Sequence, residues 1–107
     1  MNRKLICTLD GTRYYLGPTA PGRLSWQQAH DWIATLGPGY ALPPREVMLR
    51  LALTLKPEVC GFYWTVASKD KDYAWGQQWH AKYSDTSQTD TSKLRQHRAV
   101  AVMAEID

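Results

Sequence analysis

The side chains that could support catalysis are histidines and their possible acidic or nucleophilic partners, and their spacing predicts no active site. His30 and Asp31 are adjacent in a segment with helical spacing, so they point to different helix faces and cannot act as a pair. His80 ends an expected strand, and no GxSxG motif places a serine as nucleophile. The segment Gly37-Pro38-Gly39 follows a helix instead of opening one, which argues against a phosphate-binding loop. We therefore expect a protein that is not an enzyme and has no catalytic residues.

The same reasoning predicts no metal site and no cofactor. Cys7 and Cys60 lie far apart, without a CxxC motif or the Cys/His spacing of a zinc site. Calcium requires about six to eight oxygen ligands, mostly from carboxylates. The aspartates of the second half are instead scattered among lysines and threonines: Asp70, Asp72, Asp85 and Asp90. The two cysteines could form a disulfide, but two free buried thiols in a reducing cytosol are favoured.

Size and charge limit the remaining functions. The 107 residues are enough for one domain, 1–107. The net charge of +3, from 13 basic and 10 acidic residues, is too small to predict nucleic-acid binding by itself. Lys93, Arg95 and Arg98 are clustered beside His97, and a solvated segment is the simplest interpretation. No apolar run is long enough to span a membrane and no signal peptide is visible, so we expect no membrane association.

The first half of the chain predicts a hairpin followed by two helices. Segments 4–9 and 12–16 are typical of strands, and Asp10-Gly11 between them is typical of a hairpin turn, with a loop over 17–22. Ser25 and Gln28 form a capping-box pattern that begins a helix, and Gly37-Pro38 ends it. Pro43-Pro44 begins a second helix that stops at Lys56-Pro57; its apolar residues nearly fill its circumference, which indicates extensive burial.

The second half predicts a sheet. Segments 62–67 and 73–79 are rich in strand-forming residues, with a charged turn over 68–72. Segment 84–92 is entirely polar and indicates a loop. Segment 98–106 has small or apolar residues on both faces, which predicts a central strand that closes the domain.

The order of several short motifs resembles a family of small domains whose function is not known, common in bacteriophages and prophages and similar to the C-terminal domain of the Legionella collagen-like adhesin. The motifs are Leu24-Ser25-Trp26-Gln27-Gln28-Ala29, Leu42-Pro43-Pro44-Arg45-Glu46, Tyr63-Trp64-Thr65, Ala74-Trp75 and Arg98-Ala99-Val100. The resemblance covers nearly the whole chain. It implies an α+β, C-type-lectin-like fold: an N-terminal β-hairpin, two helices, an antiparallel sheet with long loops, and a closing C-terminal strand.

The resemblance implies a fold and no activity. Calcium-dependent lectins of this fold use Glu-Pro-Asn or Gln-Pro-Asp followed by Trp-Asn-Asp, and neither motif occurs in this sequence. The lectin-fold enzymes that make formylglycine use a cysteine pair late in the chain, which the positions of Cys7 and Cys60 do not match.

Ligands of this fold usually meet the second sheet and its loops, which in this chain are rich in aromatic residues. Trp64 and Trp75 occupy family motif positions, so we expect them in the core. Exposed aromatic and basic side chains would then form the partner surface, because protein interfaces are enriched in aromatic residues and arginine. The predicted surface consists of Tyr73, Trp79, His80, Tyr83, Lys93, Arg95 and Arg98.

These features favour a non-enzymatic binding module of phage or prophage origin that engages a host or phage protein. We expect it in the host bacterial cytoplasm, or alternatively as a virion component, as a monomer or homodimer. The first alternative is calcium-independent glycan binding for adhesion. A second is weak nucleic-acid binding through basic side chains with aromatic stacking, and a third is a structural accessory domain that dimerises through a sheet edge. The nucleic-acid alternative would use Arg13, Lys93, Arg95, His97 and Arg98.

Overall fold

The computed structural model describes residues 4–54, 61–79 and 87–106, which form two helices and two antiparallel sheets. In chain order the elements are β1 (Leu5–Leu9), β2 (Thr12–Thr19), α1 (Trp26–Thr35), β3 (Tyr40–Ala41), α2 (Arg45–Thr54), β4 (Gly61–Ser68), β5 (Tyr73–Trp79), β6 (Gln88–Ser92) and β7 (Val100–Ile106). Neither helix is long and apolar enough to cross a membrane.

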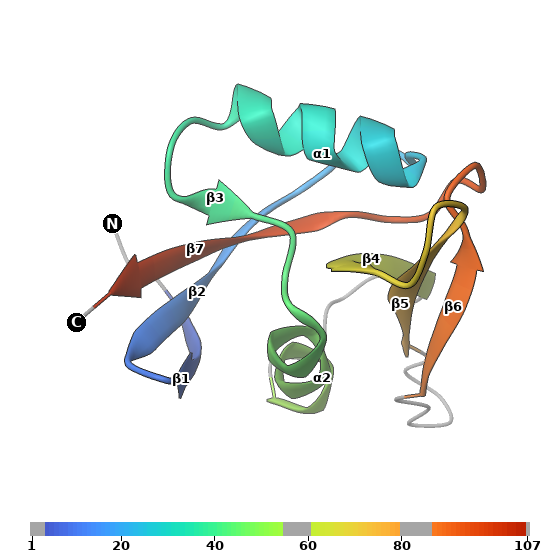
Figure 1. Ribbon diagram of the computed structural model, residues 1–107. Helices are drawn as coiled ribbons and strands as arrows, with labels where there is room; N and C mark the ends of the chain where they lie inside the picture. Colours follow the sequence, from blue (N-terminus) through green and yellow to red (C-terminus); the bar gives the residue numbers. More distant parts are fainter. Residues whose placement is uncertain (1–3, 55–60, 80–86, 107) are drawn as a thin grey trace.

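The first sheet has the strand order β1-β2-β7-β3 and joins the two ends of the described chain (Figure 1). Strand β7 pairs with β2 from Thr12↔Ile106 to Thr19↔Val100, and with β3 on its other side. Val100, Ala101 and Val102 are all buried, since this part of β7 is covered on both faces. The predicted central position of the closing strand is therefore confirmed.

Strand β2 continues beyond its predicted end at Leu16, through a segment expected to be a loop. The reason is Gly17: a Cβ atom at this position would lie 2.8 Å from the carbonyl oxygen of Ala101. Because glycine has no Cβ, the two strands can approach closely there, and the pairing resumes at Thr19 after a register shift.

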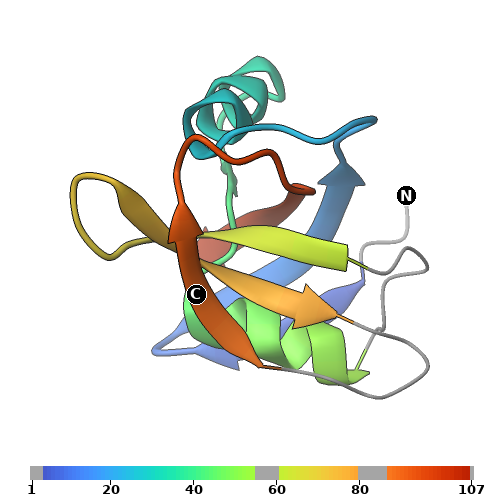
Figure 2. The ribbon, with the colours of Figure 1, turned by 90° about the vertical axis from the view of Figure 1, so that its right-hand side faces the viewer.

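The second sheet has the order β4-β5-β6, with all pairs antiparallel (Figure 2). Its edge strand β6 corrects the prediction of a loop over 84–92, of which residues 84–86 lie outside the described part of the chain. Backbone pairing with β5 does not require apolar side chains, so a polar threonine-rich segment can form an edge strand. The Gln88 side chain fixes its start, since its amide donates to the Arg45 carbonyl at 2.7 Å and to Gln77 Oε1 at 2.8 Å.

The capping box that begins α1 is formed as predicted. The Gln28 backbone amide donates to Ser25 Oγ at 3.2 Å, and the Ser25 amide donates to Gln28 Oε1 at 3.0 Å. Gly37, with φ of +100°, follows the helix. The helix buries Ala29 and Ile33 against a core cluster that includes Trp64.

Helix α2 lies between the two sheets (Figure 1) and contacts β1, β4 and β5. Four of its side chains belong to the larger core cluster: Val47, Met48, Leu51 and Ala52. Burial is nevertheless less complete than the sequence suggests, because Leu53 is 54% exposed. One face of α2 therefore makes most of the contacts of this helix with the two sheets.

We expect Leu51→Ala to lower the free energy of unfolding by about 2–5 kcal/mol, because Leu51 is only 1% exposed and its loss leaves a cavity. Leu53→Ala is the matched control on the same helix and should change that free energy by no more than about 0.5 kcal/mol. Urea unfolding followed by tryptophan fluorescence measures both. Equal losses in the two variants would contradict the assigned orientation of α2.

Candidate functional site

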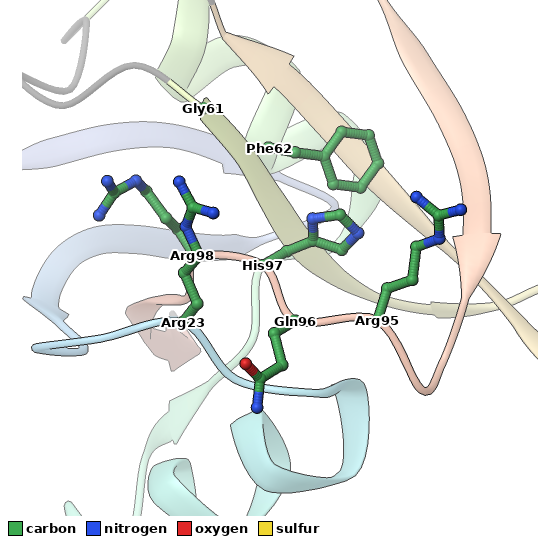
Figure 3. A pocket seen from close by; sticks show the side chains of 7 residues that line it. All are labelled: Arg23, Gly61, Phe62, Arg95, Gln96, His97 and Arg98. Carbon is green, nitrogen blue, oxygen red and sulfur yellow. The ribbon is translucent and has the colours of Figure 1, made fainter.

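A hollow of about 460 Å³ opens where the start of β4 meets the segment that precedes β7 (Figure 3). Its walls combine positive charge, two rings and an amide. It is lined by Arg23, Gly61, Phe62, Arg95, Gln96, His97 and Arg98.

Backbone hydrogen bonds hold the walls of this hollow in place. The Leu24 amide donates to the His97 carbonyl and the His97 amide to the Leu24 carbonyl, both at 2.8 Å. On the other side, the Arg98 amide donates to the Phe62 carbonyl at 2.9 Å and the Trp64 amide to the Arg98 carbonyl at 3.0 Å. Three segments that are distant in sequence are thus joined side by side, and each contributes side chains to the hollow.

The two rings of the hollow pack against each other. The centroid of the His97 ring lies 4.5 Å from that of Phe62 and 4.9 Å from that of the buried Trp64. Gly76 of β5 makes room for Phe62, because a Cβ atom there would overlap the Phe62 ring. His97 Nε2 also lies 3.3 Å from the Thr91 hydroxyl oxygen. Both rings are therefore held in fixed positions.

The three arginines of the hollow differ from three other basic side chains of the described residues, each of which is paired with a carboxylate. Arg13 pairs with Glu105, Arg50 with Glu46, and Lys69 with Asp90. Within the described part of the chain, no carboxylate forms an ion pair with Arg23, Arg95 or Arg98. The positive charges that line the hollow are therefore not neutralised by carboxylates of the described residues.

Arg98 is the most constrained of the three. Its Cδ and Nε lie 3.2 and 3.1 Å from the position that a Cβ on Gly61 would occupy, so its side chain packs directly over this glycine. Its Nε is buried and has no hydrogen-bond partner among the residues that the structure describes. A buried donor of this kind favours an acceptor supplied from outside.

The electrostatic environment of the hollow disfavours further positive charge. Burial lowers the pKa of His97 below its usual value, and the nearby guanidinium groups of Arg95 and Arg23 lower it further. Burial and these charges thus both favour the neutral imidazole, and the same charges would attract an anion. Guanidinium groups bind carboxylate or phosphate oxygens through paired N–H donors, so the arrangement can hold an oxyanion.

The structure brings together only part of the predicted partner surface. Arg95 and Arg98 line the hollow, whereas Tyr73 is 45% exposed at the start of β5. Lys93 does not line it: its ammonium donates to the Asp70 carbonyl at 2.7 Å and lies 4.4 Å from the Trp26 ring centroid. His80 and Tyr83 lie outside the described residues.

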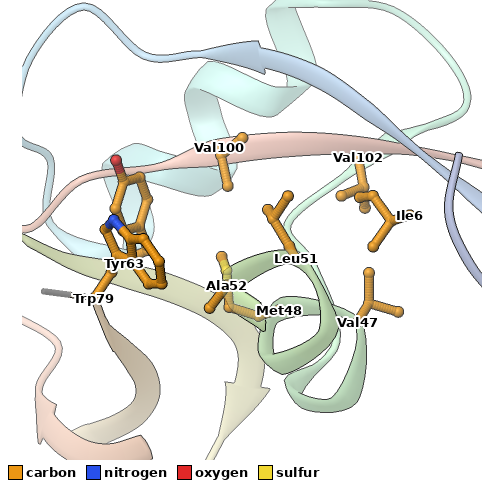
Figure 4. Close-up of a cluster of buried hydrophobic side chains, with 9 residues drawn as sticks. All are labelled: Ile6, Val47, Met48, Leu51, Ala52, Tyr63, Trp79, Val100 and Val102. Carbon is orange, nitrogen blue, oxygen red and sulfur yellow. The ribbon is translucent and has the colours of Figure 1, made fainter. Parts of the chain in front are cut away.

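The prediction that Trp79 belongs to the exposed surface is wrong. Its side chain is only 4% exposed and lies in the core cluster with Tyr63, Met48 and Ala52 (Figure 4). The physical reason is that α2 covers the face of β5 that carries Gln77 and Trp79, and both side chains are buried there. The expected burial of Trp64 is confirmed at 0% exposure.

The prediction that Trp75 lies in the core is wrong, because its side chain is only half-buried and belongs to neither core cluster. The Arg45 guanidinium covers its ring instead, with Cζ 3.9 Å from the ring centroid. This contact belongs to the outer part of the second sheet, away from the core clusters.

The predicted partner surface omits five lining residues, of which His97 was named only for the nucleic-acid alternative: Arg23, Gly61, Phe62, Gln96 and His97. The isolated Arg23 gave no signal, because its relation to Arg98 depends on the pairing of Leu24 with His97. Phe62 was assigned to a strand, which is correct, but its proximity to His97 follows only from the bridge between β4 and residue 98.

The described residues offer no alternative site of metal binding or thiol chemistry. No group of three or more His, Cys, Asp or Glu side chains is placed to hold a metal ion in this part of the chain. Cys7 is free and half-buried, and burial raises the pKa of its thiol, which disfavours the reactive thiolate. Cys60 lies outside the described residues, so its state stays a prediction.

We expect His97 to titrate below its ordinary pKa of 6.5, and Arg95→Gln to raise this pKa part of the way back. Burial is the larger cause, so the return should be incomplete. Two-dimensional NMR of the imidazole resonances against pH measures both values. Arg50→Gln, on α2 and outside the hollow, is the control. A wild-type pKa at or above 6.5, or an equal rise in the control, would contradict this description of the site.

Comparison with known proteins supports the fold. No protein-family model and no curated protein sequence matches the chain. Among solved structures, the chain is similar to EMS16, described as an antagonist of the collagen receptor integrin alpha2beta1, with a TM-score of 0.59 and 11% identity. The match covers 91% of this chain and 94% of the EMS16 chain. This protein therefore has an α+β, C-type-lectin-like fold, as the sequence resemblance implies.

Proposed function

We propose that this domain is a non-catalytic binding module and that its partner is a protein with an acidic surface. The observation that carries the proposal is the hollow lined by Arg23, Arg95 and Arg98, which form no ion pair with a carboxylate of the described residues. Unneutralised positive charge of this kind accelerates the approach of an acidic partner and selects against basic ones.

The surroundings of the hollow support a protein partner. Leu94 precedes Arg95 and is 88% exposed, so an apolar side chain stands directly beside the charged wall. Apolar contact combined with arginine is typical of protein interfaces. EMS16, which shares the fold, is described as an antagonist of a protein receptor, and this supports the use of the fold in protein binding.

The absence of catalysis is part of the proposal. The described side chains nearest the His97 imidazole are those of Phe62, Trp64 and Thr91, together with cationic arginines. A histidine that acts as a general base is usually oriented by a carboxylate or carbonyl oxygen. The surroundings of His97 suit anion binding better than proton transfer.

Glycan binding is less well supported. Sugar rings stack on exposed aromatic faces, but Trp79 is buried and Arg45 covers Trp75. Tyr73 is then the exposed aromatic side chain that remains from the described part of the predicted surface. A single tyrosine is a small platform for a sugar.

The sequence resemblance suggests where such a module works. We propose a phage or prophage origin, a host or phage protein as the partner, and action in the host bacterial cytoplasm; a virion component is the alternative. The order of the short motifs supports this origin.

The test is capture of a partner from nuclease-treated bacterial lysate by the tagged domain. Arg23→Glu combined with Arg95→Glu should reduce the amount of captured protein by about tenfold or more, because the two substitutions replace positive with negative charge in the hollow. Both native side chains are exposed, so the substitutions should not disturb the fold. Lys4→Glu combined with Lys71→Glu is the control, since it changes the net charge equally at exposed positions that do not line the hollow.

Quantitative mass spectrometry of the bound fraction, at low and high salt, measures the result. The control variant should retain the partner, and capture by the wild type should weaken as salt increases. Retention by the arginine variant, or equal loss in both variants, would rule out the hollow as the binding surface.

A further inference from the structure

The number of positive charges in the hollow indicates what kind of anion it suits. Three guanidinium groups, beside the neutral imidazole of His97, line a single space of about 460 Å³. A carboxylate has two oxygens and one negative charge, so it would leave most of this charge uncompensated. A phosphate monoester has three acceptor oxygens and a charge of about −1.5 to −2 near neutral pH, so it compensates more of the positive charge of the three arginines.

The arrangement of the side chains supports the same assignment. Arg23 and Arg98 extend to one side of His97, and Arg95 stands on the other side beside Phe62 (Figure 3). Arginine side chains can thus contact an anion in the hollow from two sides. The buried Arg98 Nε, which lacks a partner among the described residues, would gain an acceptor.

We propose that the hollow is a receptor for a phosphoryl group carried by a side chain of the protein partner. This inference rests on the proposed function and makes it more specific: recognition would depend on phosphorylation of the partner. Arg23, Arg95 and Arg98 donate to the phosphoryl oxygens, and the Phe62 ring supplies an apolar wall for the group that carries the phosphate.

A nucleic-acid backbone offers the same phosphoryl chemistry, but the surrounding surface does not favour it. Binding along a nucleic-acid strand needs a track of positive side chains. Lys69 is instead paired with Asp90 at 2.8 Å, and Lys93 donates to the Asp70 carbonyl. The exposed Leu94 beside the hollow is better suited to contact with a protein.

His97 provides a readout that belongs to this site alone. Its pKa is lowered by burial and by Arg95 and Arg23, so a bound dianion that offsets these charges should raise it. A phosphate bound elsewhere on the surface would not have this effect.

The experiment compares phenyl phosphate with benzoate as probes of the whole domain, at about pH 7.5, where the phosphate is mostly dianionic because its second pKa is about 6. Both probes carry an aromatic ring and differ in the anion. We expect phenyl phosphate to bind about tenfold more tightly by NMR titration, with shifts at Arg23, His97 and Arg98 and a rise in the pKa of His97.

Arg23→Gln and Arg98→Gln should each weaken phenyl phosphate binding by about tenfold, and Arg50→Gln should leave it unchanged. Arg23 is exposed, so its variant keeps the test valid if Arg98→Gln fails to fold. Equal affinity for the two probes, or no loss in Arg23→Gln, would overturn the proposal.

Phosphatase treatment of the lysate separates this inference from the proposed function. Loss of the captured protein after treatment supports phosphoryl recognition. Capture that survives phosphatase but is lost in the Arg23→Glu and Arg95→Glu variant would support the acidic-partner proposal and overturn phosphoryl recognition. A short oligonucleotide that binds more tightly than phenyl phosphate would overturn the assignment to a protein side chain.

Discussion

The backbone of His97 and Arg98 is bonded on two sides, and the arrangement of the two sheets depends on it. His97 exchanges two hydrogen bonds with Leu24, ahead of α1, while Arg98 bonds to Phe62 and Trp64 of β4. The chain then continues directly into β7, the centre of the first sheet. A short segment thus connects one sheet to the edge of the other and to the start of a helix.

The indole N–H groups of two tryptophans add hydrogen bonds between β4 and the residues at the start of α1. Trp64 Nε1 donates to the Leu24 carbonyl at 2.7 Å, and Trp26 Nε1 donates to the Thr65 carbonyl at 3.0 Å. Each indole therefore crosses from one segment to the other and satisfies a backbone acceptor. Since buried polar groups need partners, these bonds fix the distance between α1 and β4 as well as the burial of the rings.

The parts of this structure that were predictable are those set by neighbouring residues. Ser25 and Gln28 specify the capping box within four positions, and the apolar residues on both faces of 98–106 specify a central strand. Strand β6 was missed because polar residues at a sheet edge carry no periodic signal. The burial of Trp79 depends on where α2 lies, and the presence of Arg23 and Arg98 in one hollow depends on a pairing across more than half of the chain. Neither is visible in local sequence.

The walls of the hollow are held by main-chain hydrogen bonds, which do not depend on the identity of the side chains that they position. Arg23, Arg95 and Gln96 are exposed, so replacing their side chains alters what the hollow attracts without removing a main-chain bond that holds the fold. Such a scaffold can acquire new partners during evolution, or be redesigned in the laboratory, by exchanging a few surface residues. Gly61 and Gly76 would have to be kept, because they make room for Arg98 and Phe62.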